Sequence, residues 1–177
     1  MTRLKDLMDI FLQPGELFVG DASFQIRTIL GSCVSITLWH PFECVGGMSH
    51  FLLPTRAAPV AENVLDGRYG DEALQWMMKD MKASGINPKQ CQAKIFGGGN
   101  MFPDQPRAST ITVGQRNGEA ARLLLQDQGI EVVTESLYGV GHRQIICNVS
   151  NGDVWVRQIR PSQHEIAVEK SVRGASS

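Results

Sequence analysis

The sequence predicts an α+β protein in the form of a layered α/β/β sandwich, with mixed and antiparallel strands and two main helices on one side. Three observations lead to this prediction. Strand-like segments with a two-residue apolar period fill the first third of the chain, two amphipathic helical segments follow, and further strand-like segments lie between and after them. Strands first, followed by helices mixed with more strands, are typical of this fold class.

Length, charge and composition restrict the class of protein further. The 177 residues, with 42% hydrophobic and 20% charged residues, suit one soluble domain with a substantial core. A net charge of -1 provides no basic field for nucleic acid or an anionic membrane. No apolar run reaches the roughly 18 residues of a membrane span, and the N-terminus lacks the layout of a signal peptide. We expect a cytoplasmic protein, with a single domain over residues 1–160 and a polar, partly disordered tail over residues 161–177.

The thiols and imidazoles of the chain are widely spaced. The cysteines form no CxxC pair and indicate reduced thiols rather than a disulfide framework: Cys33, Cys44, Cys91 and Cys147. The histidines also lack the short paired spacing of a structural zinc site: His40, His50, His142 and His164. The residues therefore predict no metal site.

The N-terminal region predicts one helix and two strands. Residues 2–12 carry apolar side chains on one helical face and predict a short amphipathic helix that ends at Pro14. Two interpretations of this helix stay open, a segment packed on its own domain and an arm that binds a partner. Residues 16–20 and 24–30 predict strands.

A central hairpin gives the first indication of a functional site. Apolar and polar residues alternate over residues 34–39, Pro41 ends this strand, and a second apolar run covers residues 45–53. If the two runs pair, Cys33 and His50 lie together at one end of the sheet.

The remainder of the chain predicts two helices and four further strands. In order these are a loop over residues 54–62, a helix over 71–84 that ends at Gly85, a short strand over 94–96, a helix over 117–128 with Asn117 as N-cap and Gly129 as C-cap, a strand over 130–135, and strands over 144–149 and 154–159 around the turn Asn151-Gly152.

A thiol close to an imidazole suggests a nucleophile. A free cysteine has a pKa of roughly 8.5, and a nearby histidine takes its proton, holds the thiolate as an ion pair and can return the proton to a leaving amine. Gly31 permits a tight bend, and backbone N–H groups beside it could face an oxyanion. From the residues alone, an inert buried Cys33 and a structural His50 stay open as the alternative.

Five motifs add a resemblance that covers roughly residues 15–160. They are Leu30-Gly31-Ser32-Cys33-Val34, Gly46-Gly47-Met48-Ser49-His50-Phe51-Leu52-Leu53-Pro54, Phe96-Gly97-Gly98-Gly99-Asn100-Met101-Phe102, Gly114-Gln115-Arg116-Asn117 and the region from Gly139 to Arg143. In this order they resemble the signature of the chemoreceptor glutamine deamidases, the CheD family.

The resemblance implies a cysteine hydrolase that converts particular glutamine side chains of methyl-accepting chemotaxis receptors to glutamate and releases ammonia, without a metal or organic cofactor. Cys33 matches the nucleophile of the family and His50 the base. A threonine upstream of the cysteine completes the triad, and Thr28 is the nearest candidate here. The alternative function is a non-catalytic regulatory partner that binds chemoreceptors or a CheC-type chemotaxis phosphatase.

The spacing of the candidate triad sets a structural condition. Residues five apart on a regular strand point to opposite faces, so Thr28 and Cys33 converge only if the chain bends at Gly31.

Two further motifs keep two interpretations each. The run from Gly97 to Asn100 lacks the ending of a P-loop, and we expect either a loop that borders the substrate groove or a plain turn. Arg116 and Asn117 either stabilise loops near the active site or cap the helix that follows.

Overall fold

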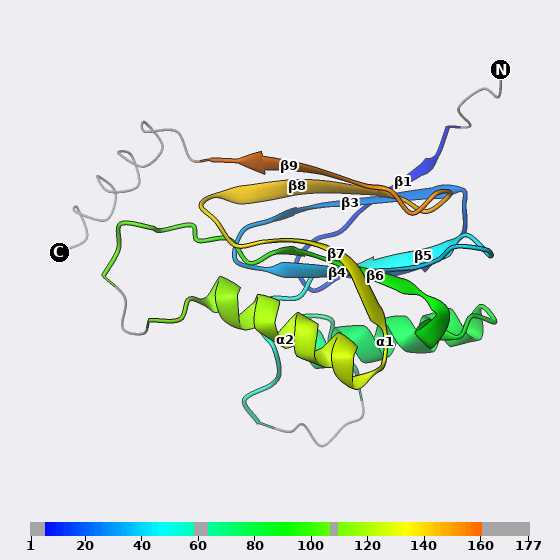
Figure 1. Cartoon of the computed structure of the whole chain (residues 1–177), viewed down its shortest axis with the longest axis horizontal. Coiled ribbons are helices and arrows are strands. Elements are labelled where there is room, and N and C mark those ends of the chain that lie inside the picture. Colours follow the sequence, from blue (N-terminus) through cyan, green and yellow to red (C-terminus); the bar gives the residue numbers. More distant parts are fainter. Residues whose placement is uncertain (1–5, 59–63, 107–109, 161–177) are drawn as a thin grey trace.

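The computed structural model describes residues 6–58, 64–106 and 110–160, which form three layers. Helices α1 and α2 cover one face of a five-stranded sheet, and a four-stranded sheet covers its other face (Figure 1). This arrangement confirms the predicted α+β layered sandwich with both main helices on one side. No helix in these ranges is long and apolar enough to cross a membrane.

Each sheet is mostly antiparallel and has one parallel pair. The five-stranded sheet has the order β2 (Leu17–Gly20), β5 (Val45–Ser49), β4 (Val34–His40), β6 (Gln92–Gly97) and β7 (Glu131–Leu137), with β6 and β7 parallel. The four-stranded sheet has the order β1 (Met8–Phe11), β3 (Phe24–Leu30), β8 (His142–Asn148) and β9 (Val154–Ile159), with β1 and β3 parallel. The helices are α1 (Gly70–Ala83), α2 (Val113–Asp127) and the short η1 (Pro88–Gln90).

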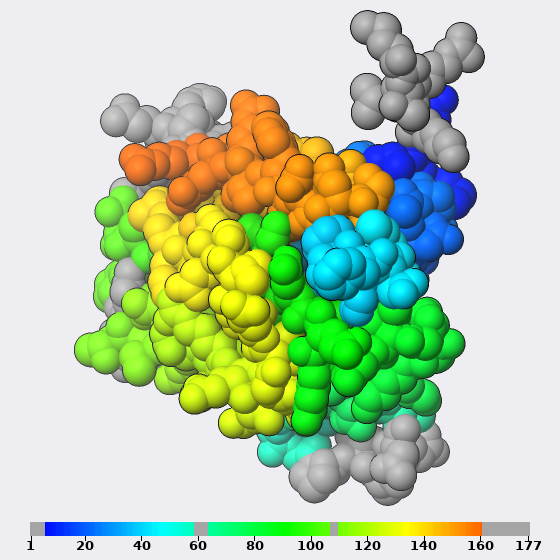
Figure 2. Space-filling view, turned by 45° about the vertical axis from the view of Figure 1, so that its right-hand side comes forward, coloured from blue at the N-terminus to red at the C-terminus, as the bar shows by residue number. Residues whose placement is uncertain are grey.

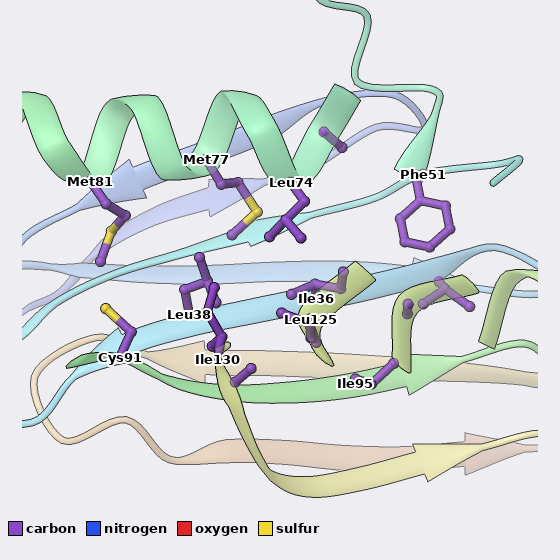
Figure 3. Packing of buried hydrophobic residues seen from close by; sticks show 14 of the residues in the cluster. Ile36, Leu38, Phe51, Leu74, Met77, Met81, Cys91, Ile95, Leu125 and Ile130 are labelled. Atoms are coloured by element: carbon purple, nitrogen blue, oxygen red, sulfur yellow. The ribbon is translucent and has the colours of Figure 1, made fainter. Parts of the chain in front are cut away.

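Two apolar cores hold the three layers together. The first lies between the helices and the five-stranded sheet, where Met77 and Met81 of α1 pack over Leu38 of β4 (Figure 3). The second lies between the two sheets and includes Ile26, Leu30 and Ile145. Strand β4 contributes to both because its alternate side chains point to opposite faces. Met77 and Met81 of α1 are fully buried in the first core.

The predicted helix over residues 2–12 is wrong in the part that the structure describes. Residues 8–11 form strand β1, which pairs with β3 in parallel register from Met8 opposite Phe24 to Phe11 opposite Arg27. The edge of β3 offers a row of backbone hydrogen-bonding groups, which favours a strand over a short helix that is marginal by itself.

Helix α2 begins one turn earlier than predicted. Its N-cap is Thr112, whose hydroxyl accepts from the Gln115 backbone N–H, and the Gln115 side chain accepts from the Thr112 N–H in return. Asn117 is therefore not an N-cap and lies fully buried inside the helix. Gly129 follows the C-cap residue Gln128 with a φ of 67°, the left-handed conformation that glycine adopts without strain.

The connection from β3 to β4 decides where the functional residues lie. At residues 31–33 the chain leaves the four-stranded sheet and enters the five-stranded one, at the same end of the molecule as the segment that follows β6 (Figure 1). The turn between β4 and β5, cyan in Figure 2, lies at the other end, beside the orange hairpin of β8 and β9. The predicted tail from residue 161 lies outside the described residues.

Candidate active site

Cys33 lies at the crossing between the two sheets and is partly exposed. Two backbone hydrogen bonds hold this crossing to the loop after β6, because the carbonyl of Cys33 accepts from the Gly98 N–H at 2.9 Å and the carbonyl of Gly31 accepts from the Gly99 N–H at 2.9 Å. Gly97 has a φ of +111°, and a Cβ there would lie 2.2 Å from the Cys33 carbonyl oxygen. Only glycine allows this close approach.

His50 follows β5 directly and is 3% exposed. The segment before β2 fixes its backbone on both sides. The His50 carbonyl accepts from the Gly15 N–H at 2.8 Å, and the His50 N–H donates to the Glu16 carbonyl at 3.1 Å. The imidazole is therefore carried by a backbone with little freedom to move.

Strand pairing brings Cys33 and His50 to the same face of the sheet. Val34 and Phe51 exchange two backbone hydrogen bonds, of 3.1 and 3.0 Å, and both side chains belong to the core under the helices. The residues just before them, Cys33 and His50, therefore point to the opposite face, between the sheets. Diagonal neighbours of this kind have Cα atoms about 7–8 Å apart, within reach of large side chains.

Thr28 reaches the same space from the other sheet. It is buried on β3, and its Oγ1 lies 2.7 Å from His50 Nδ1. The parity condition for a single strand does not apply, because the chain changes sheets at residues 31–33. Thr28 belongs to β3 of one sheet, and Cys33 directly precedes β4 of the other. The structure thus brings Thr28 beside His50 and places Cys33 on the same face as His50.

The hydroxyl of Thr28 also fixes which nitrogen of His50 carries the proton. Its Oγ1 lies 2.8 Å from the carbonyl oxygen of Leu12, which can only accept, so the hydroxyl proton is donated there. The short contact with His50 then requires that Nδ1–H donates to Thr28 Oγ1. Neutral His50 consequently keeps its free lone pair on Nε2, the nitrogen that can act as a base.

Burial favours the neutral forms of both groups. It lowers the pKa of His50 from 6.5 to about 4. Burial also raises the pKa of the Cys33 thiol, although its own backbone N–H acts in the opposite direction. Burial thus favours a neutral Cys33 thiol and a neutral His50 imidazole in the resting protein.

The depressed pKa of His50 predicts a pH-dependent stability. Between pH 6.5 and pH 4 the unfolded chain binds a proton that the folded chain excludes, so stability falls as the pH falls through this window. The contribution of His50 between pH 7 and pH 4 is about 3 kcal/mol. Urea unfolding of the wild type and of His50→Gln gives the free energy of unfolding of each protein at several pH values between 7 and 4. The difference between the two pH dependences measures the contribution of His50. Parallel curves would contradict the buried neutral imidazole.

Several known proteins are similar to this chain over most of its length. A family model described as CheD chemotactic sensory transduction matches residues 52–158. A protein of Albidiferax ferrireducens named "Probable chemoreceptor glutamine deamidase CheD 2" is 62% identical over 161 residues, 91% of this chain and 93% of that protein. Proteins named as CheD 1 of Chromobacterium violaceum (39% identical, 93% of this chain and 84% of that protein) and CheD 3 of Dechloromonas aromatica (42%, 85% and 88%) are also similar. The chain belongs to the CheD family. The resemblance inferred from the sequence is confirmed.

The CheD-family match contains the loop after β6, which borders an open groove beside Cys33. The groove has a volume of about 350 Å³, and Ser32, the residue before Cys33, is part of its lining. Its wall includes the exposed side chains of Phe102, Ile111 and Val113. Of the two interpretations of residues 97–100, the loop that borders a groove fits this geometry.

One group at the site of this CheD-family chain escaped sequence reasoning. The carbonyl of Leu12 belongs to the backbone, so no sequence pattern identifies it. Of the two interpretations of Asn117, stabilisation of loops near the site fits the structure, because its amide donates to the carbonyls of Ser32 and Leu52. In the described ranges no group of three or more His, Cys, Asp or Glu side chains could hold a metal ion.

Proposed function

We propose that this chain is a cysteine hydrolase that deamidates glutamine side chains of chemotaxis receptors. The observation that carries the proposal is the chain of contacts from Leu12 through Thr28 to His50, which leaves Nε2 of His50 as a base on the face that Cys33 shares. The receptor substrate is suggested by relatives named as probable chemoreceptor glutamine deamidases.

In the proposed first half-reaction, His50 Nε2 takes the proton of the Cys33 thiol as the sulfur attacks the carboxamide carbon. Because both groups are neutral at rest, proton transfer accompanies the attack. The backbone N–H of Cys33, which acts on its own sulfur, is a candidate donor to the oxyanion. The C–N bond then breaks, and the protonated His50 gives its proton to the leaving amine, which departs as ammonia.

In the second half-reaction, water hydrolyses the thioester. Neutral His50 takes a proton from the water as its oxygen attacks the carbonyl carbon, the C–S bond breaks, and the proton returns to the sulfur. The net reaction consumes one water and yields glutamate and ammonia. Throughout, Thr28 keeps the Nδ1 proton in place, so Nε2 alone exchanges protons.

The direct test uses purified protein and a cytoplasmic fragment of a chemotaxis receptor. Each deamidated glutamine adds about 1 Da to the fragment and releases one ammonia, as required by replacement of an amide by a carboxylate. Mass spectrometry and an ammonia assay read the two products independently. A fragment that stays unchanged in mass after prolonged incubation would contradict the proposed activity on receptors.

Thr28→Val is expected to lower kcat about 10- to 100-fold. Valine keeps the shape of threonine but leaves the Nδ1–H of His50 and the Leu12 carbonyl unpaired, a loss equivalent to about 1–3 kcal/mol. Thr28→Ser keeps the hydroxyl and is the matched control, expected close to wild type. Initial rates of ammonia release compare the three proteins. Equal rates for the valine and serine variants would remove Thr28 from the mechanism.

A further inference from the structure

A fully buried amide connects the two chain segments that carry Cys33 and His50. Asn117 of α2 donates from Nδ2 to the Ser32 carbonyl at 3.1 Å and to the Leu52 carbonyl at 2.8 Å. Ser32 directly precedes Cys33, and Leu52 follows His50 by two residues. One side chain therefore holds both candidate catalytic segments.

The position of this amide is where the strand pairing stops. The antiparallel pairing of β4 with β5 extends as far as Val34 and Phe51, whose two backbone hydrogen bonds are the last of this ladder. Beyond this pair the two segments turn to other partners, since the Cys33 carbonyl accepts from the Gly98 N–H and the Leu52 N–H donates to the Arg68 carbonyl. The amide of Asn117 replaces the next rung of the ladder.

Only the nitrogen of the Asn117 amide makes hydrogen bonds to the described residues; its oxygen makes none. Oδ1 of Asn117 is buried and has no hydrogen-bond partner among the described residues. Burying a carbonyl without a hydrogen-bond partner costs free energy. If position 117 contributed only packing, an apolar side chain would therefore be more stable there. Asparagine supplies two N–H donors on a short planar group.

We propose that Asn117 is a positioning residue that sets the separation of Cys33 from His50. It ties the Ser32 carbonyl, directly before Cys33, and the Leu52 carbonyl, two residues after His50, to α2, so its loss relaxes the distance over which His50 Nε2 takes the thiol proton. The inference rests on the proposed Cys33–His50 pair, but it does not depend on the identity of the substrate.

The test is a double-mutant cycle on the alkylation of Cys33 by iodoacetamide at pH 7, followed by peptide mass mapping. His50→Gln is expected to slow alkylation because the base is lost. Asn117→Leu is expected to slow the alkylation of Cys33 about 10- to 100-fold when His50 is present. A displacement of a reacting group by about 1 Å has an effect of this size in catalysis. In the His50→Gln background Asn117→Leu is expected to change the rate less than about twofold.

Two further variants complete the experiment. Arg116→Ala changes the exposed neighbour on the same helix and is expected to leave the rate unchanged. Asn117→Asp keeps the size of the side chain and, as the neutral acid that burial favours, has one donor in place of two, so it carries the test if thermal unfolding shows that Asn117→Leu is not folded. An equal loss of rate with and without His50, or no loss at all, would overturn the inference.

The outcome is independent of the receptor assay. Alkylation needs no receptor, so a non-additive cycle with an unchanged receptor fragment would keep the positioning role and reject the substrate. An additive cycle in an active deamidase would reject only the positioning role of Asn117.

Discussion

Cys33→Ala is expected to abolish deamidation completely. The sulfur forms the covalent bond to the substrate in the proposed mechanism. Cys91 and Cys147 are buried, and Cys44 lies in the turn between β4 and β5. The receptor fragment is expected to gain about 1 Da per glutamine with the wild type and nothing with the variant, since the acyl intermediate cannot form. Mass spectrometry of the fragment after equal incubation provides the measurement.

Cys44→Ala is the matched control for this loss. Cys44 is also a partly exposed free thiol, but it lies in the turn between β4 and β5, at the other end of the sandwich. The control is expected to keep full activity, and both variants are expected to unfold near the wild-type temperature. The same mass gain with wild type and Cys33→Ala would remove the thiol from the mechanism.

The Cys33→Ala protein also separates catalysis from binding. The groove beside Cys33 is formed mainly by the segment after β6 and the start of α2, and alanine at position 33 leaves its wall intact. We expect the variant to bind receptor fragments as the wild type does. The same comparison can be made with a CheC-type phosphatase, the other partner proposed from the sequence. Loss of binding together with activity would argue against two separable roles.

His50→Gln is expected to lower kcat by about 10²- to 10⁴-fold, the usual contribution of a general acid–base group. Glutamine approximates the size of the imidazole but cannot accept the thiol proton or return it to the leaving amine. Because the carboxamide contacts made by the rest of the site are unchanged, KM for the receptor fragment is expected to stay close to wild type. Steady-state ammonia release measures both constants.

His142→Gln is the control for this substitution. His142 begins β8, and no side-chain hydrogen bond joins it to Thr28 or Cys33 within the described ranges. It is expected to keep activity. If His50→Gln raised KM and left kcat unchanged, His50 would be a binding residue and the proposed base would have to be another group.

Most of the local structure could be predicted from the sequence. The alternation from Phe24 to Leu30 and from Val34 to His40 gave strands with almost their observed bounds, because each strand buries one set of alternate side chains. The helix predicted over residues 71–84 is α1, which differs from the prediction by one residue at each end. The helix predicted over residues 2–12 was wrong at residues 8–11, because the edge of the neighbouring strand β3 decides their conformation and local periodicity does not reveal it.

The fold class, the family and the two residues proposed as nucleophile and base could be predicted from the sequence, since periodicity and short motifs encode them locally. Three features of the site became known from the structure: Thr28 contacts His50, the Leu12 carbonyl fixes the tautomer of His50, and Asn117 joins the segments around Cys33 and His50. These contacts link different sheets and a helix across the layers. They follow from how the layers pack, so no spacing along the chain specifies them.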